Sequence, residues 1–136
     1  MIRPSSLFAL VMLVAMTVAG PAAAQEVDCA AAVAQVELTY CAEQDWIAAD
    51  ADLNLAYRAA RAAMQAIDAG LPEDQRGAEG NLRAAQRAWI TFRDAGCAAE
   101  GYGFHGGSAE PMVIYGCRAA LTRGRAEDLW ALGKGN

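Results

Sequence analysis

The sequence lacks the residues from which metal and catalytic sites are usually built. It has a single histidine, His105, and its four cysteines include no pair at Cys-x-x-Cys spacing. Zinc sites depend on such short spacings of cysteine and histidine. No Ser-x-Gly turn or second histidine accompanies His105 as a nucleophile or base. We therefore expect no metal, no cofactor and no enzymatic activity.

Sustained alternation of polar and apolar residues, the pattern of a β-strand, is also missing, as are internal repeats and low-complexity linkers. Apolar and small residues recur instead at steps of three and four, which is the spacing of one face of a helix. Three stretches show this pattern: Trp46, Ala49, Leu53, Ala56, Ala60, Ala63 and Ile67; Leu82, Ala85, Trp89 and Phe92; and Met112, Tyr115, Ala119, Thr122, Ala126 and Leu129. The sequence predicts an all-α fold, a small bundle of three main helices after a short N-terminal segment.

Glycine and proline divide these stretches. Gly70 and Pro72 are expected to end the first helix. Gly77 and Gly80 weaken the start of the second helix, which we expect to be firm only from Asn81. Gly96 and the glycines after Cys97 should end that helix and leave one long connection, residues 98–110.

The first 24 residues have the organisation of a signal peptide. Arg3 precedes an apolar run from Leu7 to Ala19 that is too short to span a bilayer, and small residues lead to a cleavage site after Ala24. We expect a single domain over residues 25–136, periplasmic or secreted, without a membrane anchor. These 112 residues carry 10 basic and 16 acidic side chains, a net charge near −6. Nucleic acid and anionic membranes are therefore excluded as partners, and a cationic protein is favoured.

All four cysteines lie in the exported part, where an even number predicts two disulfides with three possible connectivities. Cys29 and Cys41 would be about 18 Å apart on one helix, whereas a disulfide needs Cα atoms within roughly 7 Å. Their pairing requires that the chain before about Gln35 is not helical. An antiparallel hairpin would bring Cys97 opposite Cys117. We favour Cys29–Cys41 and Cys97–Cys117.

The stretch from Gln86 to Cys97 carries several polar side chains that have two interpretations. Gln86 and Arg93 are expected to bridge to carboxylates or carbonyls on the first helix, with Asp52 or Glu37 as partners, and so to fix helix register. The alternative is an arginine face that binds an anionic ligand, for which the planar fork of arginine is equally suited. In either case Trp89 and Phe92 should point toward the core.

The long connection also has two interpretations. It holds Tyr102, His105, Gly106, Gly107 and Ser108, and long loops in compact domains are often functional. As a packed turn, its aromatic residues would cover helix ends and Ser108 would cap the last helix. As a binding loop, it would offer glycine N–H groups, Ser108 and His105 to a partner.

Several motifs together resemble a known family. They are C-x(5)-Q-x-E-x(3)-C-A from Cys29, AADADLNLAY, LRAAQRAWITFRDAGC, and GGSAEPM followed by Cys117 and LTRGRAEDL. In this order they are similar to the lysozyme-inhibitor LprI N-terminal domain family of exported bacterial proteins. Ala34 departs from the family's threonine, whose hydroxyl would complete a capping box with Glu37.

The resemblance implies a helical, disulfide-bearing protein of the cell envelope. Two functions follow from it and from the acidic charge. The first is inhibition of a cationic lysozyme-type hydrolase. The alternative is a structural or interaction module that docks another envelope protein and does not inhibit hydrolases.

Overall fold

A computed structural model describes residues 26–134, which form three long helices and two short 3-10 helices. The α-helices are α1 (Gln35–Ala69), α2 (Ala78–Gly101) and α3 (Glu110–Gly133), with η1 (Glu73–Gln75) and η2 (Tyr102–Phe104) between them. No strand occurs within these residues, so the predicted all-α bundle is confirmed. None of the helices in this range is long and apolar enough to cross a membrane. The predicted signal peptide, residues 1–24, lies outside the described part of the chain.

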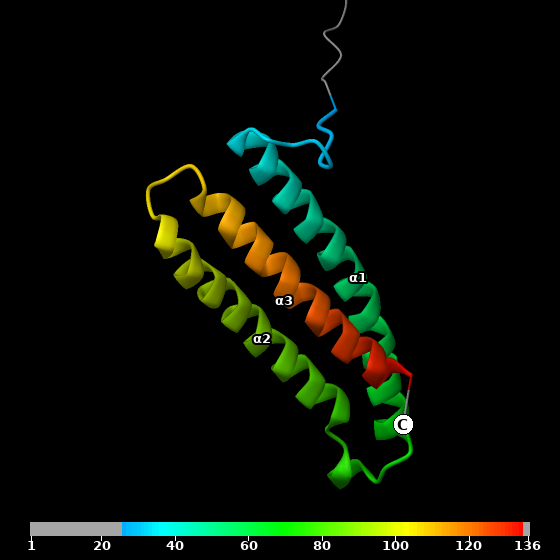
Figure 1. The fold of residues 1–136 in the computed structure, drawn as a ribbon. Helices are drawn as coiled ribbons and strands as arrows, with labels where there is room; N and C mark the ends of the chain where they lie inside the picture. Colours follow the sequence, from blue (N-terminus) through cyan, green and yellow to red (C-terminus); the bar gives the residue numbers. More distant parts are fainter. Residues whose placement is uncertain (1–25, 135–136) are drawn as a thin grey trace, which may run out of the picture.

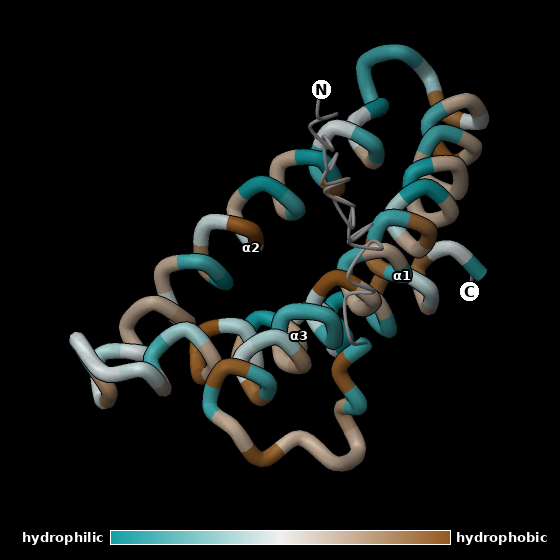
Figure 2. The backbone as a smooth tube through the Cα atoms, turned by 90° about the horizontal axis from the view of Figure 1, so that it is seen from above, coloured by the Kyte–Doolittle hydropathy of each residue, from teal (hydrophilic) through white to brown (hydrophobic). Residues whose placement is uncertain are grey.

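The helices run up and down in chain order, so that α2 is antiparallel to both of its neighbours (Figure 1). The contact between α1 and α3 is the most extensive in the molecule. Seen from above, the three helices do not lie in one plane (Figure 2). They therefore enclose a common core, to which each contributes side chains.

Alanine and leucine side chains make up this core. Its buried members are Leu53, Ala56, Ala60, Leu82, Ala126 and Leu129, with Tyr57, Met64, Trp89 and Trp130 packed against them. Alanine lets helix axes approach closely, which suits the long contact between α1 and α3. Close approach also explains Gly133, where a Cβ atom would lie 3.0 Å from the Cβ of Ala59.

Two residues of the second predicted stripe do not face the core, and Ile67 of the first stripe is 50% exposed. Phe92 is 64% exposed and Ala85 is exposed, although Leu82 is buried as expected and Trp89 is half-buried. The reason is geometric: α2 contacts the other helices through a narrow stripe that includes Leu82, Gln86, Arg93 and Cys97. Phe92 lies beside that stripe and not within it.

The start of α1 is organised by Glu37. Its carboxylate accepts hydrogen bonds from the N–H groups of Val33, at 3.3 Å, and Ala34, at 3.2 Å. This is one half of a capping box, and Ala34 has no hydroxyl to supply the other half. The helix nevertheless begins at Gln35, where the Cys29–Cys41 spacing predicted the boundary.

The junction between α1 and α2 depends on Asp68. Its carboxylate oxygens accept hydrogen bonds of 2.9 to 3.0 Å from the N–H groups of Gly77, Ala78 and Glu79. These are N–H groups that have no partner inside the helix, and their hydrogen bonds lower the pKa of the Asp68 carboxyl. With this cap α2 begins at Ala78, so the prediction that it becomes firm only from Asn81 was wrong.

Both predicted disulfides are present. Cys29 pairs with Cys41 at a Cα–Cα distance of 5.6 Å, and Cys97 pairs with Cys117 at 5.5 Å. The first holds the chain before α1 against that helix. The second joins α2 to α3 near the end of the molecule where the chain turns between them.

Candidate functional site

The connection between α2 and α3 is much shorter than predicted. The second helix does not end near Gly96 but continues to Gly101, and the single turn of η2 follows at once. Only residues 105–109 separate η2 from α3. We call residues 102–109 the tip, because they form the turn at one end of the bundle (Figure 1). The predicted loop of thirteen residues is therefore a compact turn.

Glu110 organises the tip. Its Oε2 accepts a hydrogen bond from the Gly106 N–H at 2.8 Å, and its Oε1 lies 3.1 Å from Nδ1 of His105. These two interactions, that of Gly106 first, lower the pKa of the Glu110 carboxyl. One carboxylate in the first turn of α3 thus fixes two consecutive residues of the tip.

The two glycines serve the shape of the turn. Gly106 has a φ of +76°, in the left-handed region that favours glycine. The Gly107 N–H donates to the carbonyl of Phe104 at 2.9 Å. Since the N–H groups of Gly106 and Gly107 are both engaged within the tip, they are not the donors that the sequence suggested for a partner.

The exposed groups of the tip are side chains. The ring of Tyr102 stacks on that of His105, with centroids 4.5 Å apart and planes 3° from parallel. Tyr102 is 67% exposed and Phe104 is 51% exposed, so these aromatics do not cover helix ends. Ser108 is exposed and does not cap α3, whose N-cap position is Ala109. Tyr102, His105 and Ser108 are therefore presented to solvent.

The base of the tip is held by the Cys97–Cys117 disulfide and by close packing. Cys97 is fully buried. A Cβ atom at Gly101 would lie 2.6 Å from Cγ1 of Ile114, so glycine is needed for the end of α2 to approach α3 this closely. The tip is consequently mounted on two helices that are covalently joined four residues before α2 ends.

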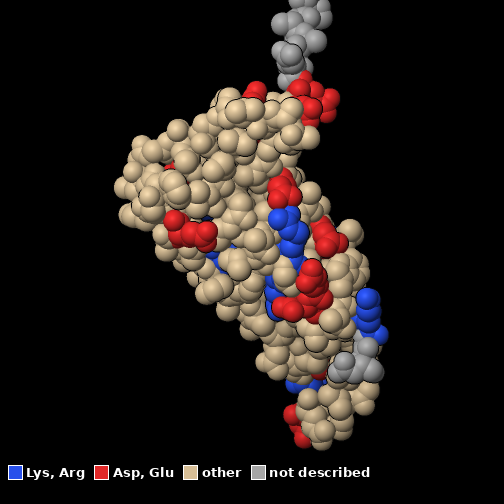
Figure 3. Space-filling view, in the orientation of Figure 1, with Lys and Arg blue, Asp and Glu red and all other residues tan. Residues whose placement is uncertain are grey.

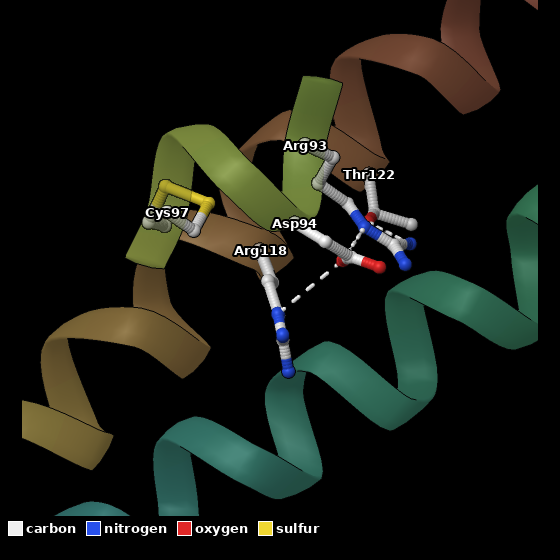
Figure 4. The surroundings of a disulfide bond; sticks show 6 residues. Arg93, Asp94, Cys97, Arg118 and Thr122 are labelled. Carbon is white, nitrogen blue, oxygen red and sulfur yellow. Dashed lines mark hydrogen bonds and ion pairs between the residues drawn. A yellow bond between two sulfur atoms is a disulfide. The ribbon is translucent and has the colours of Figure 1, made fainter. Parts of the chain in front are cut away.

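Arg93 lies one helical turn from that disulfide on α2 and is buried, with Asp94 and Thr122 beside its guanidinium (Figure 4). Its Nε is 2.9 Å from Asp94 Oδ1, and its Nη1 is 3.4 Å from the Thr122 hydroxyl on α3 and 3.6 Å from Asp50 Oδ1 on α1. The guanidinium also lies over the rings of Trp46 and Trp89, at 5.7 and 5.1 Å. Arg93 therefore connects all three helices.

The partners differ from those expected for this stretch. Arg93 reaches a carboxylate of α1, as predicted in kind, but it is Asp50 and not Asp52 or Glu37. Asp52 instead accepts a hydrogen bond from Nε1 of Trp130 on α3, at 3.1 Å. Gln86 does not bridge to α1, because its Oε1 accepts from Arg125 Nε on α3 at 3.0 Å. These contacts link α3 to each of the other helices.

Glu110 and Asp50 are the residues that the sequence interpretation missed. A signal for Glu110 was available, because an acid at the start of a helix often returns to bond the preceding turn. Asp50 lies one helical turn before Asn54, whose amide donates to Asp50 Oδ2 at 3.0 Å. The positions of these residues in the sequence did not indicate that Arg93 would pair with Asp50.

Within residues 26–134 no group of three or more histidine, cysteine, aspartate or glutamate side chains is placed to hold a metal ion. The fold and the tip define a class: small helical proteins held by two disulfides that display a short turn between antiparallel helices. Residues 28–129 match the family described as Lysozyme inhibitor LprI. The chain belongs to this family.

Two relatives extend the comparison. An uncharacterized protein of Rhizobium meliloti (strain 1021) is 47% identical over 124 residues, which cover 89% of each chain. The crystal structure of a DUF1311 family protein from Pseudomonas putida KT2440 is similar with a TM-score of 0.63 and 28% identity, over 74% of this chain and 94% of that one. DUF1311 is the same family, so a solved structure supports the fold.

Glu110→Gln should loosen the tip while leaving the helices intact, because the neutral amide is a weaker acceptor for the Gly106 N–H. Amide hydrogen exchange at Gly106 should become several-fold faster, with exchange in the middle of α1 unchanged. Acid should likewise lower the protection factor of the Gly106 amide in the wild type, which compares its exchange rate with that of an unstructured peptide at the same pH. Since the pKa of Glu110 is lowered in the folded protein, its stabilisation is complete above the usual glutamate pKa of about 4.3 and is lost as the pH falls through the lowered value. Equal exchange at Gly106 in both proteins at neutral pH would refute this role.

Proposed function

We propose that this protein is an exported, non-enzymatic inhibitor of a cationic lysozyme-type cell-wall hydrolase, and that it binds through the tip. The observation that carries the proposal is a rigid, exposed turn in a chain that matches a lysozyme-inhibitor family over residues 28–129. The disulfides fit an oxidising compartment such as the periplasm or the exterior, where such hydrolases act.

The exposed chemistry of the tip suits a glycosidase cleft. Such clefts are commonly built on two carboxyl groups, one protonated and one ionised. The hydroxyls of Tyr102 and Ser108 can donate to the ionised carboxylate. In the neutral tautomer whose Nδ1–H donates to Glu110, Nε2 of His105 is free to accept a hydrogen bond from the carboxylic acid. Gly106 and Gly107 would set the shape of the turn and not contact the target through their N–H groups.

The net charge of the protein would speed its association with a cationic hydrolase more than it would strengthen the bound complex. The net charge near −6 expected after signal-peptide removal attracts a cationic hydrolase over a distance. In Figure 3 the end of the molecule that carries the tip is largely uncharged, and acidic and basic side chains gather further along the helices. A neutral tip can enter a cleft without the cost of burying an unpaired charge.

Lysis of a cell-wall suspension by lysozyme tests the proposal. Purified protein in micromolar excess at low salt should slow lysis, and the His105→Ala/Ser108→Ala variant should inhibit at least about tenfold less, because it removes two polar contacts. Gln65→Ala, an exposed change on α1, is the matched control and should inhibit like the wild type. An unchanged lysis rate with the wild-type protein would dismiss the function. Full inhibition by the double variant would show that the tip is not the binding site.

A further inference from the structure

A groove between α1 and α2 lies well away from the tip. Its volume is about 270 Å³, and its lining includes Leu53 and Tyr57 from α1 and Arg83, Arg87 and Ile90 from α2. The two helices are antiparallel (Figure 1). Tyr57 and Arg83 therefore line one end of the groove, and Asp50 and Arg93, which are 3.6 Å apart, line the other. Ten residues of helix, about 15 Å, separate Arg83 from Arg93.

Arg83 and Arg87, at the Tyr57 end of the groove, are both exposed. Within residues 26–134 neither Arg83 nor Arg87 has a carboxylate oxygen within 4 Å, whereas Arg61, Arg93, Arg118 and Arg123 each have one. They are four residues apart on α2, so their positive charges lie close together and repel each other. In a chain with 16 acidic residues, two exposed arginines beside one groove are left without an anion.

The rest of the groove is neutral or apolar. Asp50 lines the far end, but its charge is compensated by Arg93 at 3.6 Å and its Oδ2 accepts from the Asn54 amide. Leu53 is buried in the wall, and Ile90 is 40% exposed at the rim. A ligand that fits this arrangement carries an oxyanion at one end and a short apolar group beside it.

We propose that this groove binds a small molecule that carries an oxyanion, either a carboxylate or a phosphate, next to an apolar group. Arg83 and Arg87 bind the oxyanion. Two guanidinium forks match the oxygens of such a group, and these charge-assisted hydrogen bonds are among the strongest that side chains make. The apolar group lies against Leu53 and Ile90, and the Tyr57 ring closes that end. The proposal is independent of the tip and of lysozyme inhibition.

Titration of the ¹⁵N-labelled protein followed by NMR tests it with three probes. N-acetyl-leucine has both the carboxylate and the apolar group, N-acetyl-leucinamide lacks the charge, and inorganic phosphate lacks the apolar group. N-acetyl-leucine should shift amides around residues 53–57 and 83–90, and its affinity should fall as salt is added. The amide probe should bind at least about tenfold more weakly, since it loses a hydrogen-bonded charge. Phosphate should shift residues near 83–87 alone.

Variants separate the groove from general surface charge. Arg83→Gln/Arg87→Gln should weaken N-acetyl-leucine binding at least about tenfold. Both side chains are exposed and unpaired, so the fold should be retained. Arg58→Gln removes an exposed arginine of α1 that does not line the groove and should bind like the wild type. Equal affinity for the acid and the amide, or equal weakening by Arg58→Gln, would overturn the proposal. Phosphate binding as tightly as N-acetyl-leucine would overturn the apolar subsite.

Discussion

Replacing both Cys97 and Cys117 with serine should lower the free energy of unfolding by about 3 kcal/mol. The bond joins residues 20 apart in sequence, so its loss restores considerable freedom to the unfolded chain. In the folded protein it also removes the covalent base of the tip. Urea denaturation followed by circular dichroism measures the stability, and the lysis assay measures the effect on inhibition, which should fall with it.

The second disulfide provides the matched control. Cys29→Ser/Cys41→Ser opens a loop of 12 residues and should cost a similar free energy, slightly less by chain entropy. This bond lies before and within α1 and does not join the helices that carry the tip. Inhibition should therefore survive at temperatures where the variant is folded. If both pairs reduced inhibition equally, the Cys97–Cys117 bond would act through overall stability and not through the tip.

Arg93→Ala should lower the free energy of unfolding by about 3 kcal/mol, the loss expected when a buried, multiply bonded charge is truncated. The guanidinium contacts Asp50, Asp94 and Thr122 and lies over two tryptophan rings. The partner carboxylates are 42% exposed and can be rehydrated, which moderates the cost. What is lost without compensation is the contact with the rings and the packing of the long side chain.

Arg93→Lys separates charge from shape. Lysine keeps the positive charge but has no planar fork to contact both carboxylates and lie over the rings. We expect its stability to fall between those of the wild type and Arg93→Ala, with denaturation in urea as the measurement. A loss below about 1 kcal/mol for Arg93→Ala would place this residue among ordinary surface arginines.

Much of the fold could be predicted because its signals are periodic or geometric. The stripe through Leu53, Ala56 and Ala60 requires only that apolar residues share a helix face. The favoured disulfide pairing set a geometric condition: Cys29 and Cys41 cannot meet along a continuous helix, so the chain before about Gln35 had to be non-helical. Both inferences use properties of the backbone that do not depend on which side chains happen to pack together.

The errors arose where tertiary contacts outweigh local preference. Gly96 suggested an early end to α2, but a glycine inside a helix costs only about 1 kcal/mol. Packing of Gly101 against Ile114 favours continuing the helix. Asp68 likewise starts α2 from a position nine residues before Gly77, which no local rule anticipates. Phe92 was misplaced because the face of α2 that packs is narrower than its apolar stripe.

The candidate site was identifiable as a segment but not in its chemistry. Tyr102, His105, Gly106, Gly107 and Ser108 do lie together in one exposed turn. Which of their groups face outward depends on Glu110, whose carboxylate engages the Gly106 N–H and His105. That contact spans only four residues and follows the local rule for an acid in the first turn of a helix, which the sequence interpretation did not apply to Glu110.

Chemical-shift mapping of a lysozyme complex tests the central claim most directly. The ¹⁵N-labelled protein would be titrated with unlabelled lysozyme at low salt, and each backbone amide followed to saturation. Perturbations concentrated on residues 102–109 are the predicted result. A saturable complex whose perturbations lie on α1 and spare the tip, or no perturbation at all, would contradict it.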